Sequence, residues 1–119
     1  MMTKIFVTFQ QEGVHCWAGA PDKFDYLRAL HRHMFHVRIE CFVSHSDRDI
    51  EMIDFKHKAT EQFMLSNLEH HLANGMPFFG SKSCEMMAEN VRLALVSIGY
   101  NVPQVEVSED GENGAIVYA

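Results

Sequence analysis

The sequence predicts an α+β fold with a four-stranded antiparallel sheet and two helices. Apolar residues alternate near both ends of the chain, as in half-buried strands, and recur at helical spacing in the middle. Strands and helices are therefore segregated along the chain, in the order β-β-α-α-β-β. The length of 119 residues fits one domain, which we place at residues 1–119.

The first strand is expected over residues 3–10, where apolar and polar side chains alternate. A bulge is expected at Glu12-Gly13, before a short continuation of the strand. A loop over residues 18–22 and one or two helical turns over residues 24–30 then separate this strand from the next.

The longest strand is expected over residues 31–44, because histidines and apolar residues occupy one parity and mostly polar residues occupy the other. A polar turn over residues 44–49 ends it. A short strand over residues 50–53 is expected to follow.

Two helices come next. Asp54 is expected to cap a first helix that runs to Asn74 and stops before Gly75. Ser83 is expected to cap a second helix that stops at Gly99. The last two strands, joined by a glycine-containing turn, are expected over residues 102–108 and 115–118.

Composition excludes several classes of protein. Hydrophobic residues make up 47% and charged residues 22%, which is typical of a folded chain. The net charge of −6 argues against nucleic-acid binding. No apolar run approaches the roughly 20 residues of a membrane span, and the N-terminal run is too short for a secretory signal, so we expect a cytoplasmic protein with no membrane partner. Three cysteines without a CxxC pair predict no disulfide framework.

The eight histidines are the unusual feature of the composition. On a strand, the side chains of His31 and His33 point to the same face, about 6.5–7 Å apart along the chain. Two imidazoles so placed can share a zinc ion if a third ligand comes from elsewhere, and His15 on the preceding strand is a candidate. In a histidine-rich chain, the HxH pattern also arises easily by chance.

Three other acidic or histidine positions are of interest, and two of them have two interpretations each. Glu69-His70 is either a general acid–base pair or a solvated helix end, where histidine suits the helix dipole. Glu109 is either an exposed hairpin acid or a carboxylate that accepts two hydrogen bonds from the amidine-like edge of a pterin or guanine. Glu85 is, by default, an acid that stabilises a helix N-terminus.

Taken in order, these residues resemble the 6-pyruvoyl-tetrahydropterin synthase / 6-carboxytetrahydropterin synthase family over nearly the whole chain. That family carries an early strand histidine, an HGH strand, an M-V-x-D-F helix entry, an L-D-H segment, a T-x-E helix start, a V-x-E strand and a closing aliphatic-Tyr strand. The corresponding segments are His15, His31-Arg32-His33, Met52-Ile53-Asp54-Phe55, Leu68-Glu69-His70, Ser83-Cys84-Glu85, Val107-Ser108-Glu109 and Ile116-Val117-Tyr118.

The resemblance implies the tunnelling fold (T-fold), in which subunits close their sheets into a barrel as a homotrimer or homohexamer, with active sites between subunits. It implies zinc (Zn²⁺) as the cofactor. The residues that match the family's functional positions are the zinc ligands His15, His31 and His33, the ring-binding Glu109, the helix-start Glu85, and the catalytic pair His70 and Glu69.

The implied function is that of a zinc-dependent 6-carboxytetrahydropterin synthase-like lyase. Its substrate would be dihydroneopterin triphosphate or a related purine-derived molecule, in a 7-deazaguanine (queuosine-type) pathway. Where the family usually has its catalytic cysteine, four positions before the first histidine of HGH, this chain has Leu27, which cannot transfer a proton. The middle glycine of HGH is Arg32 here, and Glu69 replaces an aspartate.

The alternative is an altered or inactive paralogue that binds zinc and a pterin- or purine-like ligand without the family reaction. Leu27 favours this alternative. The retained histidines and Glu109 favour a working pocket. The sequence places neither Cys16 nor Cys84 at a reacting atom.

Overall fold

The computed structural model describes residues 2–119, and two long strands form its centre. β1 (Thr3–His15) and β2 (His31–Val43) run antiparallel, with His15 opposite His31 at one end. The register does not change along the whole length, and Gly13 pairs regularly with His33. The bulge predicted at Glu12-Gly13 was therefore wrong.

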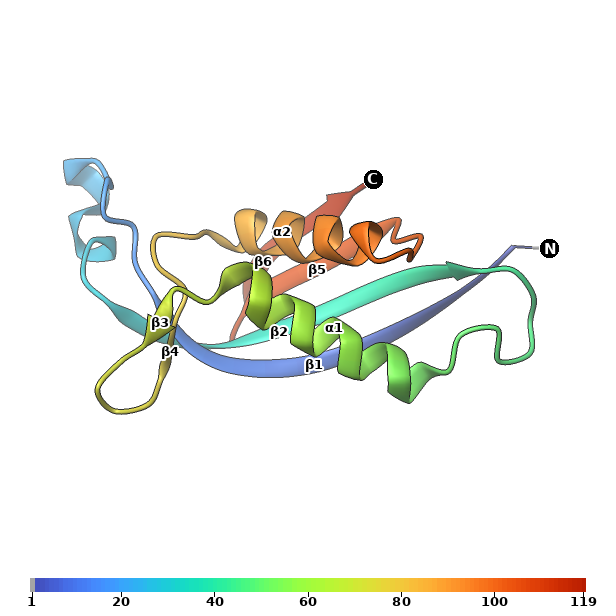
Figure 1. The fold of residues 1–119 in the computed structure, drawn as a ribbon. Helices are drawn as coiled ribbons and strands as arrows, with labels where there is room; N and C mark the ends of the chain where they lie inside the picture. Colours follow the sequence, from blue (N-terminus) through green and yellow to red (C-terminus); the bar gives the residue numbers. More distant parts are fainter. Residues whose placement is uncertain (1) are drawn as a thin grey trace.

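Shorter strands extend this pair on both sides into one sheet (Figure 1). β5 (Gln104–Glu109) pairs with β2, and β6 (Asn113–Tyr118) pairs with β5. On the other side, β3 (His70–His71) pairs with β4 (Pro77–Phe78), which runs parallel to the end of β1. The α+β class is confirmed, but the prediction of four antiparallel strands was wrong, because the β3–β4 hairpin adds two strands and a parallel pair; the order is β3-β4-β1-β2-β5-β6.

Both α-helices, α1 (Met52–Asn67) and α2 (Cys84–Ser97), cover the same face of the sheet (Figure 1). Glu51, not Asp54, caps α1, because its carboxylate accepts the N–H groups of residues 53 and 54. The helix therefore begins where a short strand over residues 50–53 was predicted, and that strand is absent from the described chain. Ser83 caps α2 as predicted.

The first helix ends at Asn67, well before the predicted Asn74. The Asn67 side chain is buried and donates hydrogen bonds to the carbonyls of Phe63 and Met87. The chain then turns into the β3–β4 hairpin, which the Phe79 N–H joins to the carbonyl of Val14 at 2.8 Å. Pairing with the edge of β1 thus replaces the last turns of the predicted helix.

The core lies between the sheet and the two helices. The odd-numbered residues of β2 from Phe35 to Cys41 are buried there, as the alternation predicted. Phe79 is fully buried against the rings of Phe35 and Phe63. Its ring occupies the space beside Gly13, where an added Cβ would come within 2.2 Å of it. Gly13 is required here for close packing.

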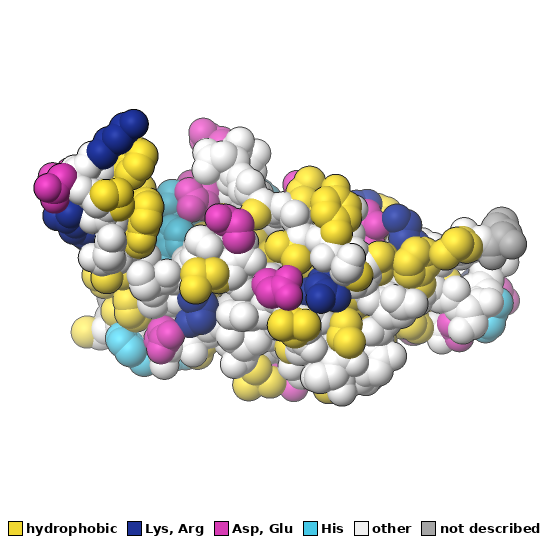
Figure 2. Space-filling model, turned by 90° about the horizontal axis from the view of Figure 1, so that it is seen from above, with side chains coloured by type: hydrophobic (Ala, Val, Ile, Leu, Met, Phe, Trp, Pro, Cys, Tyr) yellow, Lys and Arg dark blue, Asp and Glu magenta, His cyan; other side chains and the backbone are white. Residues whose placement is uncertain are grey.

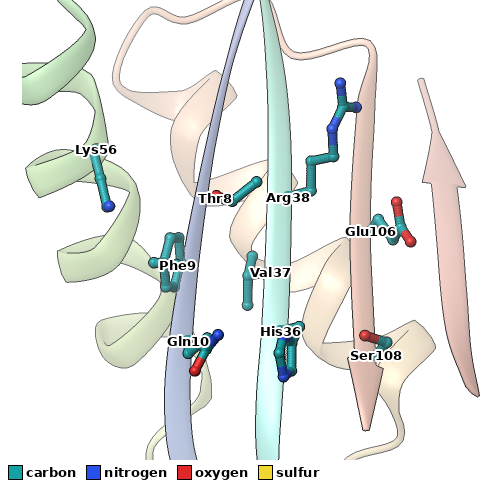
Figure 3. Close-up of a pocket in the computed structure, with 9 residues that line it drawn as sticks. All are labelled: Thr8, Phe9, Gln10, His36, Val37, Arg38, Lys56, Glu106 and Ser108. Carbon is teal, nitrogen blue, oxygen red and sulfur yellow. The ribbon is translucent and has the colours of Figure 1, made fainter. Parts of the chain in front are cut away.

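The opposite face of the sheet is polar and carries a shallow groove of about 730 Å³ across β1, β2 and β5 (Figure 3). Glu40 is buried on this face between Lys4 and Arg38, which hold its pKa below the usual range. The Arg38 guanidinium also stacks 4.3 Å from the centre of the Phe6 ring. None of the described helices is long and apolar enough to cross a membrane.

Replacing Gly13 by alanine is expected to destabilise the protein by about 1–3 kcal/mol, because the new methyl group overlaps the buried Phe79 ring. Urea unfolding measures the change. Gly19→Ala is the control, because its added Cβ meets nothing within 4 Å. Adding Phe79→Leu to Gly13→Ala should recover part of the loss, and an unchanged free energy of unfolding for Gly13→Ala would contradict the packing.

Candidate metal centre and its pocket

Three histidines converge at the end of the sheet where β2 begins. His15 and His31 are cross-strand partners, and His33 lies two residues further along β2 on the same face. Their ring centres are 4.6–5.3 Å apart. One potential ligand atom from each lies within 4.8 Å of the other two. The structure thus brings together all three predicted metal ligands.

Backbone carbonyls fix two of these rings. The Nδ1–H of His15 donates to the Lys82 carbonyl at 2.8 Å, and the Nδ1–H of His31 donates to the Ala29 carbonyl at 2.9 Å. A carbonyl oxygen only accepts, so the proton resides on Nδ1 and the lone pair of Nε2 is free to bind a metal.

A carboxylate fixes the third ring. His33 Nδ1 lies 2.7 Å from Oδ2 of Asp110, and the other carboxylate oxygen accepts the Met34 N–H at 2.9 Å. These two hydrogen bonds, first from Met34 and then from His33, lower the pKa of Asp110. Asp110 is therefore ionised near neutral pH and accepts a hydrogen bond from the Nδ1–H of His33, as the carbonyls do from the other two rings.

His15 provides the test of whether a metal fits. Its ring is buried, and burial is the main cause that lowers its pKa, so the neutral, ligating form is favoured. Its Nε2 is buried and has no hydrogen-bond partner among the described residues. A buried nitrogen without a partner is costly unless something binds it. Three imidazoles of this kind can hold a divalent metal ion.

Glu109 lies against the triad at the end of β5. Its two carboxylate oxygens are 3.4 Å from Nε2 of His15 and from Nε2 of His33, respectively. Asn113 donates to the same carboxylate at 3.4 Å, and the Cys84 thiol does so at 3.9 Å. Burial, then the charges of Glu109 and Glu85, raise the pKa of Cys84 to about 12. Cys84 is therefore a protonated donor and not a thiolate nucleophile.

The triad opens into a pocket of about 900 Å³ between the sheet end, the loop after β1 and the start of α2. In Figure 2, histidine side chains are visible in the hollow beside the projecting loop. Trp17, Tyr26, Leu27 and Met86 give this pocket a largely apolar wall. Leu27 thus lines the pocket, as its match to the family's catalytic position implied, and Cys16 lines it as well.

The other predicted site residues divide into two groups. Glu85 lines the pocket at the start of α2. Glu69 and His70 do not line it, because the early end of α1 places His70 on the exposed strand β3. Within the chain Glu69 binds Lys82 at 2.6 Å, and this ion pair is the main cause that lowers its pKa.

Sequence reasoning missed three supports of the site. The Lys82 and Ala29 carbonyls are backbone groups that no residue type signals. Asp110 is an acid in a turn, and the sequence does not show that it meets His33. In the folded chain its φ is 56°, and its carboxylate bonds to His33 and Met34 at the start of β2. Aspartate tolerates this left-handed conformation better than most residues.

The fold and the site together define an α+β protein with a pocket at one end of its sheet, in which three histidines could hold a metal ion. A sequence model of the 6-pyruvoyl tetrahydropterin synthase family matches residues 4–119, and the chain belongs to that family. The family has the T-fold, so the predicted T-fold is confirmed, whereas the closed oligomeric barrel stays a prediction; the family also supports a pterin synthase-like function.

A solved structure has the same fold: the crystal structure of an uncharacterized protein from Wolinella succinogenes. It is 16% identical to this chain, with a TM-score of 0.62, and the match covers 99% of this chain and 98% of that one. At this identity the likeness shows the fold alone. No curated protein sequence matches the chain.

Untagged protein is expected to bind about one divalent ion per chain through the three histidines. The double variant His31→Ala/His33→Ala should lose most of the metal, measured by elemental analysis. His36→Ala is the matched control, because His36 lies on β2 but lines the groove on the opposite sheet face. Full metal content in the double variant would disprove the site.

Proposed function

We propose that this protein is a zinc-dependent pterin synthase-like enzyme that resembles 6-carboxytetrahydropterin synthase. The proposed substrate is dihydroneopterin triphosphate or a related purine-derived molecule of 7-deazaguanine (queuosine-type) metabolism. The observation that carries the proposal is the convergence of three Nδ1-anchored histidines beside Glu109, in a pocket of a chain from this family.

Zinc is the proposed metal, because three imidazoles and an open fourth position are the usual donor set of catalytic zinc. When bound, zinc supplies a Lewis acid that polarises oxygens on the substrate side chain. The residues that would hold it are His15, His31 and His33. A substrate that covers the apolar wall of the pocket would displace water from it and strengthen electrostatic interactions there.

Glu109 is proposed to bind the ring of the substrate. A carboxylate can accept hydrogen bonds from the 2-amino group and the adjacent ring N–H of a pterin at the same time. Asn113 and the protonated Cys84 contact this carboxylate and would hold its orientation. Glu85, at the first turn of α2, is the second acid on the pocket wall and a further proposed substrate contact.

His70 and Glu69 are proposed to serve the pocket of a neighbouring subunit. Neither residue lines the pocket of its own chain, and the family resemblance implies active sites between subunits. The long edge of β1 is paired only at Val14, and β6 pairs only with β5 among the described residues, so two strand edges can join other copies. We therefore propose a homotrimer or homohexamer with a closed barrel.

Two observations favour the alternative function, a paralogue that binds zinc and a pterin- or purine-like ligand without the family reaction. Leu27 lines the pocket where the family usually has its catalytic cysteine, and it offers no proton. Lys82 is the only Lys or Arg in the described lining, and Glu69 already neutralises it. A polyanionic triphosphate therefore finds little charge compensation within one subunit.

Zinc-loaded Glu109→Gln is expected to bind neopterin at least about tenfold more weakly, because each charge-assisted hydrogen bond contributes about 1.5–3 kcal/mol and the amide places a donor against a ring N–H. Calorimetric titration measures the affinity. Glu106→Gln is the control, since Glu106 lies on β5 but lines the groove on the outer sheet face. Equal binding by wild type and Glu109→Gln would show that Glu109 does not bind the ring and is only an acid of the β5–β6 hairpin.

Leu27→Cys is expected to gain turnover of dihydroneopterin triphosphate in an anaerobic assay. A general acid–base group contributes about 10²–10⁴-fold, so the wild type should be slower than the variant by a measurable part of this range. Leu30→Cys, an exposed position outside the pocket, is the control. Family-like turnover by the wild type would refute the role given to Leu27, and Cys16→Ala would then test the neighbouring thiol.

A further inference from the structure

Of the three hydrogen bonds that hold the histidine rings, one can be changed by mutation. His15 and His31 donate to backbone carbonyls, which persist whatever side chain is present. His33 donates to the carboxylate of Asp110 at 2.7 Å. The orientation and the protonation pattern of His33 therefore depend on a single side chain.

Asp110 is itself held by two hydrogen bonds to Met34 at the start of β2. Its N–H donates to the Met34 carbonyl at 2.8 Å, and its Oδ1 accepts the Met34 N–H at 2.9 Å. These bonds leave Oδ2 to face His33 Nδ1. The left-handed backbone of Asp110, with φ of 56°, turns the chain so that the carboxylate returns to β2.

We propose that Asp110 is a positioning residue of the metal centre, which keeps the proton of His33 on Nδ1 and so keeps Nε2 available as a ligand. A neutral imidazole carries one proton, on either nitrogen. An ionised carboxylate is only an acceptor, and it selects the Nδ1–H form. Carboxylates that orient metal-bound histidines in this way typically raise metal affinity 10- to 100-fold.

The proposal makes a specific prediction for Asp110→Asn. Asparagine has the same shape and also tolerates positive φ, so the turn is kept. The Met34 N–H needs the amide oxygen, so the NH₂ group faces His33 Nδ1. An NH₂ group can only donate, and it drives the proton to Nε2, the nitrogen that must bind the metal.

The test is a Zn²⁺ competition titration against a chromophoric chelator, with untagged wild type, Asp110→Asn and Glu112→Gln. Glu112→Gln removes one charge from the same turn, and its side chain has no hydrogen bond among the described residues. The expected result is a 10- to 100-fold loss of zinc affinity for Asp110→Asn and little change for Glu112→Gln. Equal losses in both variants would reduce the effect to net charge and overturn the proposal.

Nitrogen-15 NMR of the metal-free proteins reads the tautomer of His33 directly. The wild type should carry the proton on Nδ1 and Asp110→Asn should carry it on Nε2. Retention of the Nδ1–H form in Asp110→Asn would overturn the proposal. A misfolded variant would instead disturb the signals of all the histidines, including His36 on the opposite face of the sheet.

A double-mutant cycle separates positioning from a general effect on the site. In a His33→Ala background, Asp110→Asn should no longer change zinc affinity, because its action passes through His33. An equal loss with and without His33 would overturn the proposal. The inference rests on the metal centre of the proposed function, but none of these measurements uses a pterin, so failure of pterin binding would leave them unaffected.

Discussion

The antiparallel pairing of β1 with β2 is the interaction on which the rest of the structure depends. The register is constant over the whole length of both strands, so residues of like parity share one face. On β2, the core residues and the two histidines His31 and His33 share one face, and the histidines lie at the N-terminal end of the strand. The same ladder that forms the core thus carries the histidines to its end, and a slip of one residue would turn His31 and His33 to the other face.

A second set of contacts joins this sheet end to the helical layer. The Phe79 ring fills the space beside Gly13, and the Phe79 N–H bonds to Val14, so the segment after β4 is held against β1. That segment leads directly to the Lys82 carbonyl that fixes His15, and then to the Ser83 cap of α2. The contacts of the core therefore extend to the hydrogen bond that orients His15 in the histidine triad.

The pocket combines three histidines that could hold a metal ion with few groups that could transfer a proton. Three histidines, Glu109 and Glu85 line it, and so does Leu27, whose side chain cannot transfer a proton. The two nearby thiols differ: Cys84 is held protonated beside Glu109, and Cys16 lines the pocket with its thiol directed at the Gly80 carbonyl at 3.8 Å. Ligand binding and chemistry are separable functions in such a site.

By itself, the sequence determined the elements with strong local patterns. The alternation along β2, the Ser83 cap and the HxH pair depend on residues close together in the chain, so period and capping chemistry predicted them. The order of the motifs also pointed to the family, which the match over residues 4–119 shows.

Only the tertiary structure decided the features that depend on contacts between distant segments. The hairpin of β3 and β4 ended α1 at Asn67 and moved His70 away from the pocket of its own chain. The tautomers of the triad depend on two carbonyls and on Asp110, 77 residues from His33 in the sequence. Backbone carbonyls carry no residue-specific signal, and an acid in a turn gives no sign of the imidazole it will meet, so these supports become visible only once the chain is folded.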